Sequence, residues 1–238
     1  MSVIYLGYDP GGGGAHGVAS IIGDEVRCDT LDTADDAINW FTDRYNAHSQ
    51  PSEVLMGVDT LTLWSTGPAG WRPADILLRE IYPFVIHSIQ APNALRGAMP
   101  INGAAVVRVL GERIPQLRVT ETHPKVLYYA LTNQPYDYPG ENNAMIQQLQ
   151  EWVGIELNEI DSDHEWDALI SAYVARQWET GQWTFDLHQL PSLPTEHLIP
   201  IYNNQSHYIW PKAIQNLDQI LLQKRPSDRS PAQPRKRP

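Results

Sequence analysis

Three short apolar segments, each ending on an acidic residue, constrain most strongly what this chain can fold into. They are residues 2–9 with Asp9, residues 53–59 with Asp59, and residues 116–121 with Glu121. Apolar runs of this length are typical of strands buried in a sheet. Because the carboxyl ends of parallel strands lie at one edge of a sheet, we expect these acidic side chains to meet there.

The segments around these acids predict a mixed α/β sheet flanked by helices. Pro10 and four glycines break the chain after Asp9, and Gly23-Asp24 separates two further short strands. We therefore expect the first three strands to be antiparallel neighbours. From Asp32 the apolar positions recur with a helical period, which predicts a crossover helix and makes residues 53–59 a parallel neighbour of the first strand. Further helices are expected at 103–113, 125–131 and 162–178, the last one beginning at the capping box Ser162-Asp-His-Glu165.

Composition along the chain predicts one main domain, followed by a Pro-rich appendage and a basic tail. The domain spans residues 1–183 and contains a Gly-, Pro- and Trp-rich insertion at about 60–103, which we expect to form a lid with a short helix. A Pro-rich appendage follows at 184–223. Its residues 211–222 predict an amphipathic helix that could join two copies in a homodimer. Residues 224–238 are basic, rich in proline and poor in apolar side chains, so a disordered tail is expected.

The charge distribution limits the partners of this chain. Its 238 residues include 28 acidic and 17 basic residues, a net charge of −11. Six bases and one acid give the tail a net charge of +5 and leave −16 for the rest. Such a body repels polyanions unless cations or local patches intervene. One cysteine, Cys28, and no apolar run long enough for a membrane span predict a cytoplasmic protein with no membrane partner.

A cluster of carboxylates predicts a metal site. The helix expected from Ser162 offers Asp163 and Asp167, four residues apart and therefore on one face. Like charges at such spacing repel one another unless a divalent cation neutralises them, and oxygen ligands alone suit Mg²⁺ or Mn²⁺. Two such ions could activate a water and stabilise the leaving oxygen in phosphodiester cleavage.

Several motifs in the sequence resemble those of the DUF429 family and occur in the same order. They are Gly7-Tyr-Asp-Pro-Gly-Gly, Gly57-Val-Asp-Thr-Leu-Thr-Leu-Trp64, Arg72-Pro-Ala-Asp-Ile-Leu-Leu-Arg79, Glu121-Thr-His-Pro124 and Asp163-His-Glu-Trp-Asp-Ala-Leu169. The resemblance covers about residues 1–178 and implies a ribonuclease-H-like fold and a predicted nuclease. The closing pattern, His164-x-x-Asp167-Ala-Leu, is also similar to the last motif of RuvC-type Holliday-junction resolvases, whose acidic sites bind two metals.

The resemblance implies a role for each candidate residue. Asp9, Asp59 and Asp167 would be the catalytic metal ligands for Mg²⁺ or Mn²⁺. Glu121 would assist them, and His164 and Asp163 would be accessory residues. Arg72 and Arg79, in the Trp-rich insertion, suit contacts with the phosphates or bases of a DNA or RNA substrate.

These residues also have structural explanations. Asp9 could shape a turn, Asp59 could cap the following segment, and Glu121 or Thr122 could cap the helix that begins at Pro124. Asp163 and Glu165 lie in a first helical turn, where acids are favoured by the helix dipole, and His164 could be exposed there. Asp167 could form an ion pair with Arg72 or Arg79, and these arginines with Asp75 could simply lie on a helix surface.

Two other functions therefore remain open at this point. The same fold could serve as a non-catalytic module that binds nucleic acid or protein. Alternatively, Asp9-Pro-Gly-Gly-Gly-Gly could be the phosphate loop of an actin-like ATPase. That class has a duplicated second domain with another Gly-rich phosphate loop, and no such loop follows Gly111 in this sequence.

Overall fold

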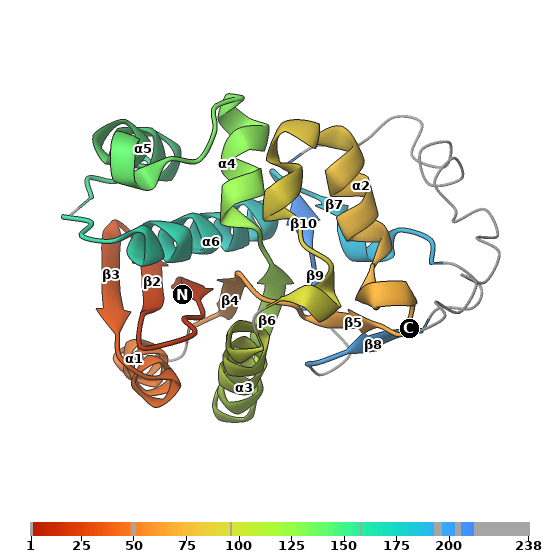
Figure 1. The fold of residues 1–238 in the computed structure, drawn as a ribbon. Coiled ribbons are helices and arrows are strands. Elements are labelled where there is room, and N and C mark those ends of the chain that lie inside the picture. The colour runs from red at the N-terminus through yellow and green to blue at the C-terminus, as the bar shows by residue number, and fades with distance from the viewer. Residues whose placement is uncertain are drawn as a thin grey trace, which may run out of the picture.

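The computed structural model describes residues 2–48, 51–95, 97–157, 159–192, 197–202 and 206–211. The basic tail at 224–238 and the amphipathic helix predicted at 211–222, apart from Pro211, lie outside these residues. The described part is a layered α/β structure with one central sheet between two sets of helices (Figure 1). No helix in these ranges is both long and apolar enough to cross a membrane.

The central sheet contains six strands of the described chain, in the order β3-β2-β1-β4-β6-β9. They are β1 (Val3–Asp9), β2 (His16–Ile22), β3 (Glu25–Leu31), β4 (Glu53–Val58), β6 (Leu117–Glu121) and β9 (Ser206–His207). The first three strands are antiparallel neighbours, whereas β1, β4, β6 and β9 run parallel. This order and these directions confirm the ribonuclease-H-like α/β fold.

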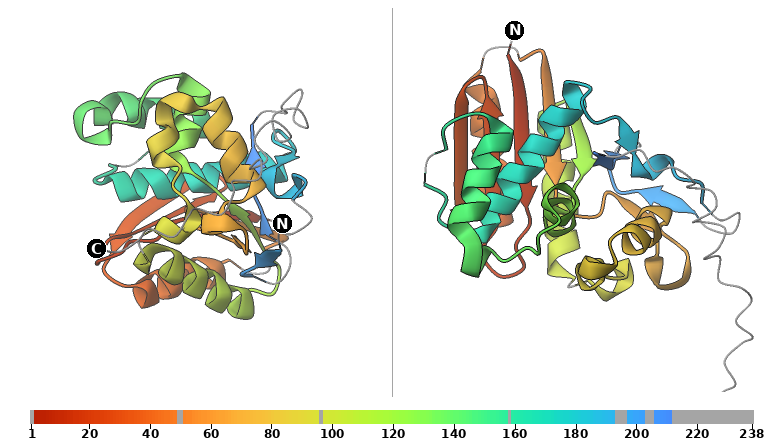
Figure 2. Two further views of the ribbon diagram at one scale, coloured as in Figure 1. Left: turned by 45° about the vertical axis from the view of Figure 1, so that its right-hand side comes forward. Right: turned by 90° about the horizontal axis from the view of Figure 1, so that it is seen from above.

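Helices cover both faces of the sheet. On one face lie α1 (Ala34–Asn46) and α3 (Ala98–Arg113). On the other face α6 (Asp163–Glu179) crosses the strands, and α2 (Pro73–Ile81), α4 (Pro124–Thr132) and α5 (Tyr138–Val153) lie beyond it (Figures 1 and 2). Each face buries its own hydrophobic core. The helix α5 was not predicted, since its first turns are polar and contain Pro139 and Gly140.

The alternation of side chains along the strands directs the strand-end acids toward α6. Even-numbered residues of β1 and β4, such as Leu6 and Met56, belong to the core under α1 and α3. Because successive side chains point to opposite faces, the odd-numbered residues of both strands face α6. Asp9 and Asp59 therefore lie on the α6 side, at neighbouring strand ends.

Three glycines allow α6 to lie directly on the sheet. A Cβ atom added to Gly7 of β1 would be 1.8 Å from the carbonyl oxygen of Ala168. The corresponding distances are 2.0 Å from Gly17 of β2 to the His164 oxygen and 2.0 Å from Gly57 of β4 to the Ser171 oxygen. Real Cβ atoms do not approach this closely, so the helix backbone lies where side chains would otherwise be. This contact brings the inner face of α6 within reach of the strand ends.

The insertion between β4 and α3 forms a structured flank beside the strand ends. It contains β5 (Leu63–Ser65), the 3₁₀ turns η1 (Pro68–Gly70), η2 (Pro83–Ser88) and η3 (Pro92–Ala94), and the helix α2. α2 occupies the range in which the short helix was predicted. β5 pairs antiparallel with β8 (Leu198–Pro200), so a segment near the C-terminus completes this flank.

Residues beyond 184, predicted to form an appendage, contribute to the main sheet and its core. β9 pairs with β6, and β7 (Phe185–Asp186), which precedes the turn η4 (Leu187–Gln189), pairs with β10 (Ile209–Trp210). Tyr208 and Trp210 are 2% and 1% exposed. Strands of two residues are too short to show a period in the sequence, which is why this contribution was not predicted.

Candidate metal centre

Three aspartates converge at the carboxyl edge of the sheet. Asp9 ends β1, Asp59 directly follows β4, and Asp167 lies in the second turn of α6. One carboxylate oxygen from each lies within 4.8 Å of the other two. Asp9 and Asp167 are 7% and 4% exposed, and Asp59 is more accessible. The structure thus brings together the three residues that the sequence suggested as metal ligands.

The electrostatics of these aspartates indicate a missing positive charge. Burial raises the pKa of Asp9 to about 6, and the Asp59 charge adds to this effect. Burial, followed by the charges of Asp9 and Asp59, raises the pKa of Asp167 well above its usual range. Among the described residues, Asp167 Oδ1 has no partner within hydrogen-bond distance, although the nearby Tyr136 hydroxyl lowers the pKa of Asp167. A buried carboxylate oxygen without a partner costs free energy unless a cation or a proton reaches it.

His164 is brought to the same site from the first turn of α6. Its Nδ1 donates a hydrogen bond of 2.6 Å to Asp9 Oδ2. This hydrogen bond raises the pKa of His164, although burial opposes the shift. The hydroxyl of Ser162 caps the helix by accepting from the Glu165 N–H at 3.1 Å, as the capping box predicted. Asp163, in the same turn, is not part of the three-aspartate group.

Glu121, expected to assist the three aspartates, is directed elsewhere. Its carboxylate accepts hydrogen bonds of 2.6 and 2.7 Å from the terminal nitrogens of Arg72, and one of 2.9 Å from the Thr62 N–H. Burial alone would raise its pKa, but the Arg72 charge and His188 lower it to about 2. Glu121 shares the strand parity of Leu117 and Val119, which lie in the core under α1 and α3. The residue beside Asp59 on the α6 side is the next one along, Thr122.

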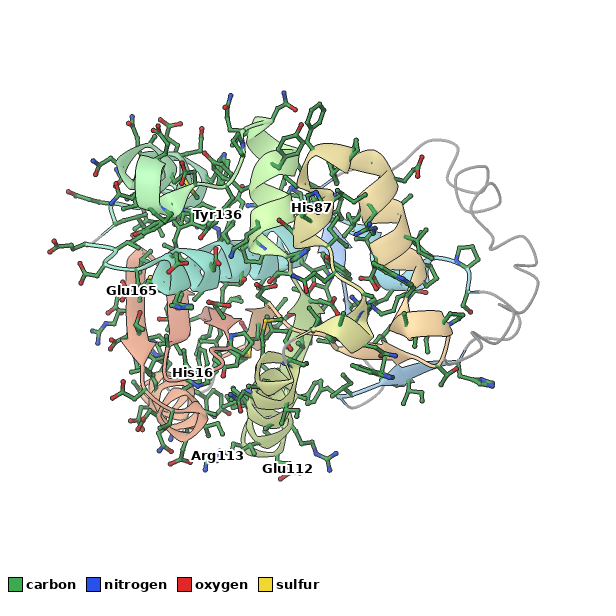
Figure 3. All side chains as sticks on the ribbon, viewed as in Figure 1. His16, His87, Glu112, Arg113, Tyr136 and Glu165 are labelled. Carbon is green, nitrogen blue, oxygen red and sulfur yellow. The ribbon has the colours of Figure 1, made fainter. Side chains whose placement is uncertain are left out.

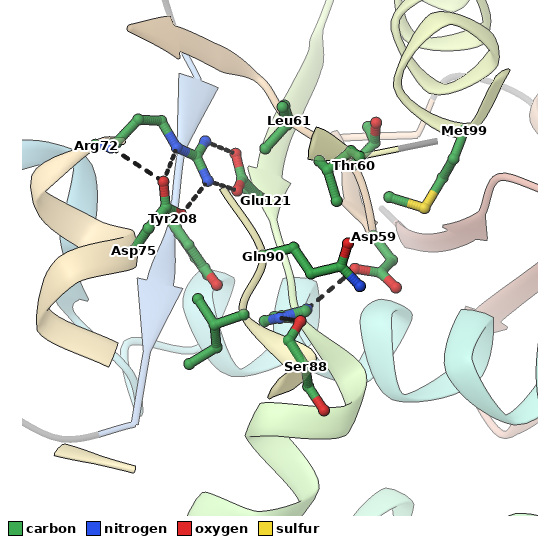
Figure 4. Close-up of a pocket in the computed structure, with 13 residues that line it drawn as sticks. Asp59, Thr60, Leu61, Arg72, Asp75, Ser88, Gln90, Met99, Glu121 and Tyr208 are labelled. Carbon is green, nitrogen blue, oxygen red and sulfur yellow. Dashed lines mark hydrogen bonds and ion pairs between the residues drawn. The ribbon is translucent and has the colours of Figure 1, made fainter. Parts of the chain in front are cut away.

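Arg72 and Arg79, expected to contact substrate, hold the insertion together instead. Arg72 is 2% exposed and forms ion pairs with Asp75 and Glu121 (Figure 4). Arg79 donates to the carbonyl oxygens of Ile86 and Ile89 at 2.9 and 2.5 Å. Neither arginine pairs with Asp167. The sequence shows that these arginines are present, but it does not show that buried carboxylate and carbonyl oxygens accept their hydrogen bonds.

His123 belongs to the motif Glu121-Thr-His-Pro124, and the sequence alone does not assign it a role at the site. Its Nδ1 lies 3.6 Å from Asp59 Oδ1, and its Nε2 lies 3.1 Å from the carbonyl oxygen of Ser88. It is the N-cap residue of α4, and its side chain makes no capping hydrogen bond. One sequence signal could have indicated its position. His123 lies two residues after the end of β6, and β6 is the neighbour of β4, the strand that precedes Asp59.

Lys125 and Tyr136 also lie near the aspartates, and no sequence pattern pointed to either residue as part of the site. The Lys125 charge lowers the pKa of both Asp9 and Asp167, and its Nζ lies 5.2 Å from the centre of the Tyr136 ring. Tyr136 lies on the α6 side of the sheet (Figure 3), where burial and the Asp167 carboxylate raise its pKa. Lys125 is exposed, so it gives this acidic edge an accessible positive charge.

A small pocket adjoins the site on the side of the insertion. It has a volume of about 50 Å³, and its lining includes Asp59, Ser88, Gln90 and His123. Figure 4 shows Ser88 and Gln90 beside Asp59 in this pocket. The features that fit a divalent cation lie around the three aspartates themselves: an unpartnered buried oxygen of Asp167 and the two adjacent histidines, His123 and His164. The chemistry of the donor set therefore agrees with the metal expected from the sequence.

Comparison with known proteins assigns the chain to a family. The model of the family DUF429, described as "Protein of unknown function", matches residues 7–188. The chain belongs to the DUF429 family. The range matched by the DUF429 model contains the three aspartates together with His123, Lys125, Tyr136 and His164.

Comparison with solved structures gives a match for this DUF429 protein. The chain is similar to the RuvC structure of Thermus thermophilus, with 17% sequence identity and a TM-score of 0.39. The similarity covers 76% of this chain and 97% of that chain. No curated protein matches the sequence.

Proposed function

We propose that this protein is a nuclease that hydrolyses phosphodiester bonds with divalent cations, Mg²⁺ or Mn²⁺, held by Asp9, Asp59 and Asp167. The observation that carries the proposal is the convergence of these three carboxylates within 4.8 Å, with the buried Asp167 Oδ1 left without a partner. An ordinary structural acid would be neutralised by a protein cation, as Glu121 is by Arg72.

The residues around the aspartates have separable tasks in this reaction. Bound cations would activate a water and neutralise charge on the leaving oxygen. His164 fixes the orientation of Asp9 through its hydrogen bond and leaves the other oxygen of that carboxylate available. Lys125 offers an accessible charge to a substrate phosphate. The water oxygen forms the new bond to phosphorus, the bond to one sugar oxygen breaks, and that oxygen takes up a proton.

The substrate class is a nucleic acid, either DNA or RNA. Outside the tail the chain carries a net charge of −16, so the metal ions themselves would attract the phosphate backbone. The basic tail at 224–238 would add a second point of attraction.

The test is a metal titration against labelled single-stranded, double-stranded and branched DNA and RNA. We expect cleavage of at least one of these substrates that requires Mg²⁺ or Mn²⁺ and is abolished by EDTA and by Asp167→Asn. Asp163→Asn, in the first turn of the same helix, is the matched control and should retain activity. If Mn²⁺ binds to the wild-type protein but no substrate is cleaved, the protein is a metal-binding module without turnover. If no divalent cation binds, the proposal is wrong.

A further inference from the structure

His123 is oriented by a backbone carbonyl of the insertion. The Ser88 oxygen, 3.1 Å from Nε2, is an acceptor and cannot donate. Nε2 must therefore carry the proton, so the neutral ring presents an unprotonated Nδ1.

The unprotonated nitrogen faces a second group that has only lone pairs. Nδ1 lies 3.6 Å from Asp59 Oδ1, which is beyond hydrogen-bond distance. Two acceptors in this position repel one another unless something positive lies between them. By contrast, His164 Nδ1 lies 2.6 Å from Asp9 Oδ2, which is the distance of a strong hydrogen bond. The two histidines at this site therefore have different relations to their aspartates.

The separation suits two ligands of one cation. Metal bonds of about 2.1 Å at angles of about 90–110° place two ligand atoms about 3.0–3.4 Å apart. A shift of a few tenths of an ångström would bring His123 Nδ1 and Asp59 Oδ1 into this range. Histidines that bind metals almost always donate their other ring N–H to a carboxylate or a backbone carbonyl. The Ser88 carbonyl meets this requirement, and the pocket of about 50 Å³ that Asp59, Ser88 and His123 help to line is large enough to hold water beside a cation.

We propose that His123 is a further protein ligand, through Nδ1, of a divalent cation held on the Asp59 side of the three-aspartate site. This inference rests on the proposed function, because it adds a nitrogen ligand to that same metal centre. Mg²⁺ strongly prefers oxygen ligands, whereas transition metals accept imidazole. The position that includes His123 therefore favours Mn²⁺ over Mg²⁺. In this arrangement the insertion contributes to the metal centre, because its Ser88 carbonyl orients the imidazole ring of His123.

The experiment uses the full chain and Mn²⁺ alone as the probe. Pulsed EPR on the Mn²⁺-loaded protein detects coupling between the metal and a ligating ¹⁴N nucleus. We expect the coupling in the wild type and in His164→Leu, and its loss in His123→Leu. Calorimetric titration should show about tenfold or greater weakening of Mn²⁺ binding in His123→Leu, with a change below threefold for Mg²⁺. Unfolding in EDTA checks that each variant is folded. If His123→Leu does not fold, His123→Asn is used in its place.

The outcomes separate this inference from the proposed function. If the wild type binds Mn²⁺ without ¹⁴N coupling, or if the coupling persists in His123→Leu, His123 forms only an ion pair with Asp59 and the inference is wrong. The three-aspartate site stands in either case. If the wild type binds no Mn²⁺, the proposed function fails, and this inference fails with it.

Discussion

His164 donates a hydrogen bond of 2.6 Å to Asp9, whereas Asp167 Oδ1, in the following turn of the same helix, has no partner in the described residues. The helix α6 thus supplies His164 as a hydrogen-bond donor to one aspartate and Asp167 as an acceptor without a donor. This difference predicts how stability and activity change when individual side chains are replaced.

Asp167→Asn should raise the free energy of unfolding of the metal-free protein by about 1–2 kcal/mol, because it removes a buried carboxyl group whose ionisation is opposed by burial and by Asp9 and Asp59. The same change should abolish metal-dependent cleavage. Urea unfolding in EDTA, together with the cleavage assay, measures both effects. A less stable variant with full activity would mean that Asp167 is a structural residue.

The stability of the metal-free protein should fall as the pH rises from about 4 to above 7. The folded-state pKa of Asp9 is raised from 3.8 to about 6, so the folded protein holds this proton more tightly than the unfolded chain does. Its stabilising effect is present at low pH and is lost as the pH rises through 6, by about 2–3 kcal/mol. The raised pKa of His164 acts in the same direction at somewhat higher pH.

Unfolding in EDTA between pH 4.5 and 8 measures this slope. In His164→Asn the part of the slope that comes from Asp9 should move to higher pH, because His164 lowers the pKa of Asp9. Saturating Mn²⁺ should reduce or reverse the slope, because the cation binds the ionised carboxylates. A free energy of unfolding that rises steadily with pH in EDTA would contradict the raised pKa of Asp9.

Glu121→Gln should destabilise the protein by about 2–4 kcal/mol, because it leaves the buried Arg72 guanidinium with only Asp75 as its charged partner. Mn²⁺ affinity should be unchanged. Glu112→Gln is the matched control, since Glu112 is exposed and pairs with the exposed Arg108; its effect should be below about 1 kcal/mol. Lost Mn²⁺ binding at unchanged stability would place Glu121 in the metal centre after all.

Gly7→Ala should lower both stability and Mn²⁺ affinity, although residue 7 contributes no ligand. The added methyl group overlaps the Ala168 carbonyl, so α6 must move away from β1 at a cost of about 1–3 kcal/mol or more. Gly97→Ala is the control, since a Cβ there meets no atom within 4 Å. Thermal unfolding and calorimetric Mn²⁺ titration measure the two effects. Wild-type Mn²⁺ affinity in Gly7→Ala would show that the depth of α6 is unimportant for the site.

Deletion of residues 224–238 should weaken nucleic-acid binding without changing Mn²⁺ affinity. The tail carries a net charge of +5, and each lost phosphate contact lowers the slope of log affinity against log salt by roughly 0.7–0.9. Binding of a catalytically inactive variant, measured at several salt concentrations, tests this. An unchanged affinity and slope would make the tail a passive appendage.

The sequence predicted the three aspartates because strand ends and a capped helix are local signals. Glu121 was misplaced because a strand end located to within one residue leaves the side-chain face undetermined. In a period-two element, that error changes the direction of a side chain, and the Glu121 carboxylate points to Arg72 and not to the three aspartates. The positions of Arg72 and His123 depend on contacts between the insertion and the end of β6, where Arg72 pairs with Glu121 and His123 meets the Ser88 carbonyl. No local sequence pattern encodes these contacts.

The contact of α6 with Gly7, Gly17 and Gly57 means that the metal centre is specified partly by residues that have no side chain. A related chain could retain every aspartate and still lose the centre if one of these positions acquired a methyl group, because the helix would then carry its ligand away from the other two. These three glycines therefore provide a criterion, independent of the acidic residues, for separating family members in which the three aspartates can converge from members that keep only the fold.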